Sequence, residues 1–282
     1  MPESRLRSVV LISDFGDSPY TGIMRGVIKS IDPGIDVIDG THGVPNFSAL
    51  AGAYVVYNMY RWMPKESVIV AVIDPGVGGS RKALAVKAGD YYFVGPDNGV
   101  LYPAIAREGF QFGVALDYAS VNKLATSKFK GKLPPQGWRV SDTFHGRDVF
   151  APAAALIAIN TPLDVLGVPI SQSDMRKLTL EAVERQEEGY RLKIIYIDKF
   201  GNIALSATQG ALPLRQWQRV AVTTSGGAMY QAVVGRKFSD VSPGDLVIYV
   251  NSFGFVEIAA NQDSAARKMG VSIGDKVGIV PI

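Results

Sequence analysis

The sequence predicts a two-domain protein, with an N-terminal α/β domain that holds a mainly parallel sheet and a smaller C-terminal all-β barrel. The chain has 282 residues, which exceeds the ~100 to 200 residues typical of one domain. Up to about residue 160, short β-branched runs alternate with longer segments of helical period, as in a parallel sheet with crossover helices. Beyond residue 188, short strands follow one another with turn signals between them, which is typical of a small barrel.

The N-terminal half begins with a buried strand, Ser8 to Ile12, and a helix from about Tyr20 to Ile31 that ends at Asp32-Pro33-Gly34. The run Ser67 to Ile73 is apolar at every position from Val68 onward, so we expect it at the centre of the sheet, buried on both faces. The other elements expected here are a strand at 36–39, a helix at 48–63, a hairpin of strands 83–88 and 91–94, a helix after the loop 95–99, and a helix at 149–159.

The segment 161–188 has no strong period and ends in the charged stretch 181–188, so we place the domain boundary there. Residues 1–180 are then the α/β domain and residues 189–282 the barrel. The strands expected in the barrel are 191–198, 203–206, 219–224, 246–250, 255–259 and 276–280.

Composition excludes several classes of function. The formal net charge of +3 is spread along the chain, whereas a nucleic-acid-binding protein gathers basic residues on one face. Two histidines and no cysteine supply too few nitrogen and sulfur ligands for a transition metal, and we expect no cofactor. The first apolar run, Val9 to Ile12, is too short for a signal-peptide core, and no run reaches the ~18 apolar residues of a membrane span. We therefore expect a cytoplasmic protein with no membrane partner.

The loop Asp74 to Arg81 follows the expected central strand and is the most informative stretch of the sequence. Three glycines in four residues, at 76, 78 and 79, let the backbone pass close to a ligand, while an acid and a base flank them. The loop lacks the spacing of a phosphate-binding P-loop and of a dinucleotide fingerprint. The alternative is a tight turn in which Asp74 caps backbone amides and Arg81 is solvated.

His145 lies in the segment Asp142 to Asp148, immediately before the apolar helix 149–159. A helix N-terminus disfavours protonated imidazole, so a neutral histidine here can accept a proton from a water molecule or orient it. The other histidine, His42, lies in a Gly-Thr-His-Gly loop. For both residues the alternative is a side chain that fastens a loop by hydrogen bonds.

Three further loops carry candidate binding residues. Asp14 follows the first strand, and its carboxylate can accept both hydroxyls of a ribose diol, although an Asx turn is a common alternative. Asp198 and Asn202 stand four residues apart, a pairing suited to a zwitterionic amino-acid group, or an ordinary hairpin turn. Ser252, in Asn-Ser-Phe-Gly, is a similar case.

Taken together, these segments resemble the S-adenosylmethionine hydrolases, also called hydroxide adenosyltransferases, which are related to fluorinase and chlorinase. Six motifs occur in register over nearly the whole chain. They are Ser-Asp-Phe-Gly at 13–16, Asp-Gly-Thr-His at 39–42, Asp-Pro-Gly-Val-Gly at 74–78 with Arg81, Gly-Pro-Asp-Asn-Gly at 95–99, Thr-Phe-His-Gly-Arg-Asp at 143–148 and Phe-Gly-Asn at 200–202.

The resemblance implies a metal-independent homotrimer whose active sites lie between the nucleoside-binding catalytic first domain of one subunit and the barrel of the next. It implies that Asp74, Arg81 and His145 form the water-activating triad, and the halogenase relatives depart at the first of these positions. It further assigns the small-molecule contacts: Asp14 to the ribose hydroxyls, Phe47 to the adenine by stacking, and Asp198, Asn202 and Ser252 to the methionine moiety. Phe253 departs from the pattern, because some halogenases carry an arginine there.

The expected reaction is attack of activated water on the 5′ carbon of S-adenosylmethionine, which yields adenosine and methionine. The sulfonium makes methionine a good leaving group, so neither an acid nor a metal is needed. Three alternatives stay open at this point: a halide as the nucleophile, a non-catalytic module that binds S-adenosylmethionine or adenosine, and a magnesium-dependent phosphoesterase. The last would use Asp14, Asp74, Asp97 and Asp142.

Overall fold

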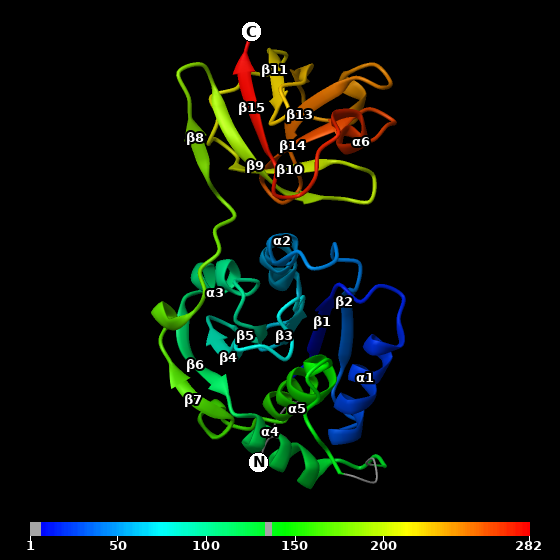
Figure 1. The fold of residues 1–282 in the computed structure, drawn as a ribbon, viewed down its shortest axis with the longest axis vertical. Coiled ribbons are helices and arrows are strands. Elements are labelled where there is room, and N and C mark those ends of the chain that lie inside the picture. Colours follow the sequence, from blue (N-terminus) through cyan, green and yellow to red (C-terminus); the bar gives the residue numbers. More distant parts are fainter. Residues whose placement is uncertain (1–6, 133–136) are drawn as a thin grey trace. The chain divides into compact units, whose positions relative to one another are not determined.

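The computed structural model describes residues 7–132 and 137–282 (Figure 1). Residues 1–6, at the start of the region where we expect no export signal, lie outside the described residues. Contacts divide the chain into two compact units, Met1–Leu178 and Thr179–Ile282. Each unit is described by itself.

Unit 1 contains a mixed sheet covered by helices, which confirms the predicted α/β class. In spatial order its strands are β2 (Val37–Thr41), β1 (Val9–Ser13), β3 (Val68–Val72), β5 (Tyr91–Pro96), β4 (Ala83–Ala88), β6 (Phe110–Leu116) and β7 (Gly167–Ile170). The pairs β2–β1, β1–β3 and β3–β5 are parallel, whereas β5–β4, β4–β6 and β6–β7 are antiparallel. Strand β6 therefore runs in the same direction as β5, and both end at the same edge of the sheet.

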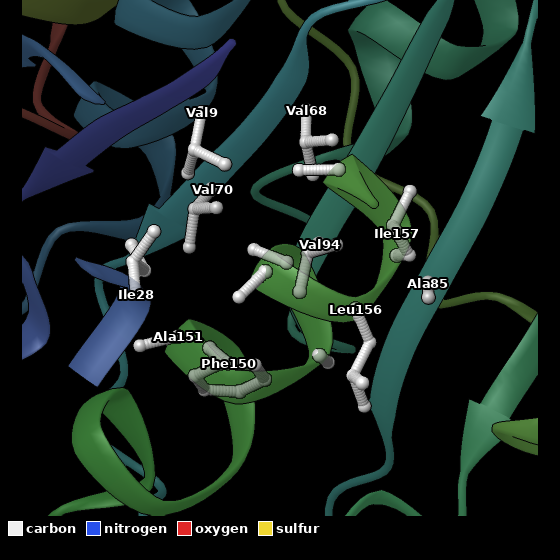
Figure 2. Packing of buried hydrophobic residues seen from close by; sticks show 14 of the residues in the cluster. Val9, Ile28, Val68, Val70, Ala85, Val94, Phe150, Ala151, Leu156 and Ile157 are labelled. Atoms are coloured by element: carbon white, nitrogen blue, oxygen red, sulfur yellow. The ribbon is translucent and has the colours of Figure 1, made fainter. Parts of the chain in front are cut away.

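The predicted central strand is confirmed, because β3 lies between β1 and β5 and all its residues are buried. Alternate side chains of the parallel strands face opposite layers of helices. One layer contains α1 (Pro19–Ile31) and α5 (Ala151–Ala158), and Figure 2 shows Leu156 and Ile157 of α5 packed over this face of the sheet. The other contains α2 (Ala49–Met59) and α3 (Tyr102–Glu108). On that side Gly52 allows close packing, since a Cβ there would stand 3.1 Å from Ile73.

Helix α1 shows how local sequence fixes an element. Proline occupies its first turn, and its buried residues Met24, Val27, Ile28 and Ile31 recur at the spacing of one helical face. The helix ends where predicted, at Ile31, because Asp32 precedes a proline and such a residue disfavours helical backbone.

Several elements of unit 1 differ from the prediction. The expected helix 48–63 ends at Met59 and continues as a 3₁₀ turn, Tyr60–Trp62. The expected helix 149–159 begins as a π-helical turn, Gly146–Phe150, before α5. Strand β6, helix α4 (Tyr118–Lys128) and strand β7 were not predicted. Their apolar patterns are weak: α4 buries only Val121 and Ala125, and β7 is an edge strand that contains a proline.

Unit 2 is a closed barrel, as predicted, and it has seven strands where six were expected. Its strands are β9 (Tyr190–Ile197), β10 (Ile203–Thr208), β11 (Arg219–Thr224), β12 (Met229–Val234), β13 (Leu246–Val250), β14 (Phe255–Ala260) and β15 (Lys276–Pro281). Pairing of β9 with β10 closes the ring, and a short strand β8 (Val183–Arg185) adds to β9 outside it. The interior is apolar, with Ile194, Ile203 and Ile258 among its buried residues. Strands β8 and β12 and the short helix α6 (Ala265–Met269) were not predicted, and all three residues of β8 are exposed.

Within the described residues, no helix combines the length and the apolar composition that crossing a bilayer requires. The most apolar one, α5, has 8 residues, all of them buried in unit 1.

Candidate active site

A cavity of about 250 Å³ opens at the edge of the unit 1 sheet where strands β1 and β3 end. The carboxyl ends of parallel strands meet at one edge, which is where α/β proteins bind ligands. The lining residues are Asp14, Phe15, Tyr20, Asn46, Phe47, Val72, Asp74, Val77, Thr143, Phe144, His145 and Gly146. Four predicted site residues, Asp14, Phe47, Asp74 and His145, are thus at one cavity.

Arg81 joins the acid and the histidine. Its Nε donates to Asp74 Oδ1 over 3.0 Å, and its Nη2 donates both to Asp74 Oδ2 and, over 2.7 Å, to His145 Nδ1. Only 10% of the Arg81 side chain, 4% of the Asp74 side chain and 4% of His145 are exposed. The alternative of a solvated arginine is therefore wrong, and the three residues form one buried, charge-assisted network.

A glycine brings the two segments of this network together. Gly78 has φ +75°, and a Cβ there would stand 2.2 Å from the carbonyl oxygen of Asp142. The loop 74–81 therefore packs backbone to backbone against the segment that leads to His145. Glycine suits this position both because its φ is positive and because it has no side chain.

The contact with Arg81 fixes which nitrogen of His145 carries a proton. A guanidinium only donates hydrogen bonds, so Nδ1 must accept, and a neutral His145 carries its hydrogen on Nε2. Burial, and next the positive charge of Arg81, lower the pKa of His145, and the negative charge of Asp74 offsets them only in part. The neutral imidazole is therefore the form favoured at neutral pH.

The π-helical turn gives His145 its setting. His145 precedes this turn, and the N–H of Ala151 donates to the carbonyl of Gly146, five residues back. A π turn is one residue wider than an α turn and is often found at functional sites. The ring of Phe150, within this turn, lies under the guanidinium, with its centroid 5.4 Å from Arg81 Cζ. The residue before the turn and the last residue of the turn thus both contact Arg81.

A second set of the same residue types lies on the surface of unit 1. Asp39 accepts hydrogen bonds from Arg25 and, over 3.3 Å, from His42 Nε2. The Asp39 and Arg25 side chains are 40% and 46% exposed, so water screens their interaction. His42 Nδ1 also lies 2.9 Å from Ser13 Oγ, so this histidine fastens its loop to the ends of β1 and β2 by hydrogen bonds, which is the alternative given above.

Asp14 and Phe47 contact each other at the cavity. Asp14 Oδ2 accepts a hydrogen bond of 2.9 Å from the backbone N–H of Phe47. Phe47 has φ +63° and is 73% exposed. A bulky residue in left-handed backbone is strained, and such strain often occurs at binding sites. The pair thus places a carboxylate and an accessible aromatic ring at the same opening.

The predicted residues of unit 2 are only partly brought together. Asp198 Oδ2 accepts from Asn202 Nδ2 over 2.8 Å, and Asp198 Oδ1 accepts the backbone N–H groups of Phe200 and Asn202, each over 2.9 Å. This is the hairpin-turn alternative, with the carboxylate ordering its own loop. Ser252 lies exposed in the loop between β13 and β14, after Asn251.

Glu257 in β14 is a residue that the sequence analysis missed. Its carboxylate accepts hydrogen bonds from the Tyr249 hydroxyl and, over 2.8 Å, from Asn251 Nδ2. Burial raises its pKa, and the negative charge of Asp198 adds to this effect. Glu257 thus holds Asn251, in the loop of Ser252, and its charge interacts with that of Asp198. The feature of the sequence that could have revealed Glu257 is that it is the single carboxylate within the otherwise apolar run 255–260.

Comparison with known proteins identifies the family. Residues 9–167 match the family model of the SAM hydroxide adenosyltransferase N-terminal domain, and residues 192–278 match that of the C-terminal domain. The chain belongs to the SAM hydroxide adenosyltransferase family. The resemblance drawn from six sequence motifs is therefore confirmed.

Curated relatives of this chain include hydrolases and a fluorinase. It is 36% identical to an (R)-S-adenosyl-L-methionine hydrolase of Salinispora tropica, over 92% of each chain. It is 32% identical to the protein of that name from Thermus thermophilus, over 98% of this chain and 100% of the relative. A fluorinase of Actinopolyspora mzabensis is 22% identical over 99% of both chains. An uncharacterized conserved protein from Thermotoga maritima has a similar crystal structure, with 32% identity and a TM-score of 0.81 over 96% of this chain and 99% of that one.

The aspartates proposed for a magnesium-dependent phosphoesterase are not assembled into one site in this chain. Among residues 7–132 and 137–282, no three His, Asp or Glu side chains lie close enough together to hold a metal ion. Asp97 instead accepts the backbone N–H of Arg176 over 2.7 Å, and both oxygens of Asp74 accept hydrogen bonds from Arg81. The set Asp14, Asp74, Asp97 and Asp142 therefore does not form one site.

The lowered pKa of His145 predicts a pH dependence of stability. As the pH falls, the unfolded chain binds the proton first, because its histidine keeps the ordinary pKa of about 6.5. The contribution of neutral His145 to stability is then complete above that pKa and is lost as the pH falls below it. We expect the free energy of unfolding in urea to decrease from about pH 7.5 to about pH 5.5, and to decrease less in His145→Gln. An equal decrease in both proteins would contradict this prediction.

Proposed function

We propose that this protein hydrolyses S-adenosyl-L-methionine to adenosine and L-methionine, by in-line attack of water on the 5′ carbon. The observation that carries the proposal is the buried Asp74–Arg81–His145 network at the wall of a cavity that also presents Asp14 and Phe47. Relatives at 32% to 36% identity are named as hydrolases of the (R) form. A sulfonium centre is a stereocentre, and we propose the same epimer as the preferred substrate here.

The network supplies what an attacking water needs. Asp74 lines the cavity, and each carboxylate oxygen retains acceptor capacity beside its bond to Arg81. In the proposed step the water donates a hydrogen bond to Asp74, while the Nε2–H of His145 orients the water oxygen. This refines the sequence-based assignment, which gave proton removal to His145 together with Asp74.

The proposed step balances without a metal or an added acid. The water oxygen forms a bond to the 5′ carbon as the carbon–sulfur bond breaks, and the electron pair of that bond leaves with the methionine sulfur. The proton of the water passes to Asp74 and then to solvent, while the positive charge of Arg81 favours the developing hydroxide. General-base assistance is typically worth about 100- to 10,000-fold in rate. Holding the water and the 5′ carbon at attack distance adds to this effect.

The nucleoside is assigned to the same cavity. Asp14 would accept the ribose hydroxyls through the acceptor capacity that its bond to Phe47 leaves free. The exposed ring of Phe47 would stack on the adenine.

Replacing Phe47 by alanine is expected to raise KM by about tenfold and to leave kcat almost unchanged, because stacking of a base on an aromatic ring is worth about 1–3 kcal/mol. Trp62→Ala is the matched control, because Trp62 is also exposed, at 77%, and does not line the cavity. Steady-state kinetics of both variants measure the effect. An unchanged KM in Phe47→Ala would remove Phe47 from the substrate site.

The methionine moiety is assigned to Asp198, Asn202 and Ser252 of unit 2, following the family resemblance. The same proposal includes a homotrimer and a cytoplasmic location. Light scattering of the purified protein tests the trimer. Asn202→Ala tests the assignment, with KM for S-adenosylmethionine expected to rise.

Chromatography of incubations with the (R) and (S) epimers of S-adenosylmethionine tests the function. We expect adenosine and methionine in equal amounts, faster from the (R) epimer, and unchanged by EDTA or by added chloride. A halogenated nucleoside in place of adenosine would make the protein a halogenase. Tight binding with no product would make it a binding module.

A further inference from the structure

We propose that Tyr118 is a positioning residue of the Asp74–Arg81–His145 network. The hydroxyl of Tyr118 holds Arg81, and the ring of Tyr118 holds the imidazole of His145. The kinetic part of this proposal rests on the proposed function, whereas the geometric part does not. Tyr118 does not line the cavity, so it would act through the two residues that it contacts.

The fold places Tyr118 at the same edge of the sheet as the network. It is the first residue of α4, and only Asp117 separates it from β6, which runs in the same direction as β5. Asp117 fixes this position, because its N–H donates to Leu166 O and its carboxylate accepts the N–H of Ser120, each over 2.9 Å. The backbone of Tyr118 is therefore anchored on the strand side and on the helix side.

Tyr118 contacts two members of the network at once. Its hydroxyl oxygen accepts a hydrogen bond of 3.1 Å from Arg81 Nη1, since the guanidinium can only donate. Its ring meets the imidazole of His145 edge to face, with centroids 5.2 Å apart and planes inclined by 74°. Such an arrangement is the preferred one for aromatic rings, and it restrains the imidazole against rotation.

The hydroxyl completes the restraint of the guanidinium. Nε and Nη2 of Arg81 donate hydrogen bonds to Asp74 and His145. The ring of Phe150 covers one face of the guanidinium. The remaining nitrogen, Nη1, donates to the Tyr118 hydroxyl. Without the hydroxyl, a nearly buried N–H of a charged group would lose its acceptor, which is costly. The guanidinium would then tilt to find another partner. Because Nη2 serves both Asp74 and His145, that tilt would displace both.

The kinetic test compares Tyr118→Phe with Tyr91→Phe. Both variants keep the ring and remove one hydrogen-bonded hydroxyl from unit 1, and the Tyr91 hydroxyl donates to Met63 O, away from the network. We expect kcat to fall about tenfold in Tyr118→Phe with KM little changed, an effect of the size expected from the loss of one hydrogen bond to a charged group. We expect Tyr91→Phe to keep the wild-type kcat. Equal kcat values in the two variants would overturn the proposal.

The second test does not depend on activity. The chain has only two histidines, so ¹⁵N NMR shows two imidazoles, and His42→Asn assigns them. The charged groups that act on His145 are Arg81, Asp74, Asp148 and Asp142, and burial and Arg81 together keep its pKa low. In Tyr118→Phe we expect a higher His145 pKa and some Nδ1–H tautomer, because Arg81 is no longer held against Nδ1. Thermal unfolding verifies that the variant is folded.

The two tests separate the two proposals. An unchanged His145 titration in Tyr118→Phe would overturn the positioning role, whatever the kinetics show. If the wild-type protein yields no adenosine, the proposed function fails, and the NMR titration still decides the role of Tyr118.

Discussion

Asp74→Asn is expected to lower kcat by about 100- to 10,000-fold, the range typical of a lost general base. The amide keeps the shape of the side chain, but it has no negative charge to accept the proton of the attacking water. KM is expected to change little, because Asp74 is assigned to the water and not to the substrate. Quenched-flow or steady-state assays of adenosine formation measure the effect.

Two controls belong to this prediction. Asp263→Asn removes a carboxylate that is also paired with an arginine, Arg267, on the exposed surface of unit 2, and it is expected to keep the wild-type kcat. Breaking a buried ion pair costs about 3–5 kcal/mol of stability, so Asp74→Asn is expected to be less stable than the wild type. Urea unfolding of this variant verifies that it is folded under the conditions of the assay. A folded Asp74→Asn with kcat within about threefold of the wild type would exclude Asp74 as the acceptor of the proton.

Arg81→Lys is expected to have the second-largest effect, a fall in kcat of about 100-fold or more. The charge is kept, but an ammonium is a point charge and not a planar fork. It cannot bond both oxygens of Asp74 while also donating to His145 and Tyr118. Arg267→Lys on the surface of unit 2 is the matched control and is expected to have no effect.

Chemical rescue of a variant that lacks Arg81 shows whether activity is lost because the guanidinium is missing or because the protein is no longer folded. Arg81→Ala leaves a space of the size of a guanidinium next to Asp74 and His145, so added guanidinium ion is expected to restore part of the activity. Methylammonium, which carries the same charge without the planar fork, is expected to restore less. Equal rescue by both ions would show that only the charge of Arg81 matters.

The sequence was sufficient to predict the parts of the site that follow from the strongest local signals. The continuous apolar run at 67–73 predicted the central strand, and the glycines after it predicted a loop that passes close to a ligand. Because parallel strands end at one edge, Asp14 and Asp74 were expected at the same crevice, and the structure places both at one cavity.

Other parts depend on contacts between distant segments and have no local signal. Tyr118 was missed because β6 has an irregular pattern of burial, so its end could not be located. The π turn at 146–150 looks like the start of an ordinary apolar helix in the sequence. The tautomer of His145 is set by Arg81, 64 residues earlier in the chain. The role of Glu257 likewise depends on packing of β13 against β14.

Incubation of S-adenosylmethionine with the protein in ¹⁸O-labelled water is the most direct test of attack by water on the 5′ carbon. Mass spectrometry is expected to find one ¹⁸O atom in the 5′ hydroxyl of adenosine and none in methionine, with Asp74→Asn forming the same product far more slowly. Three results would contradict water as the nucleophile at this carbon. They are adenosine without the label, label in methionine, and a halogenated nucleoside formed at the expense of adenosine when chloride is present.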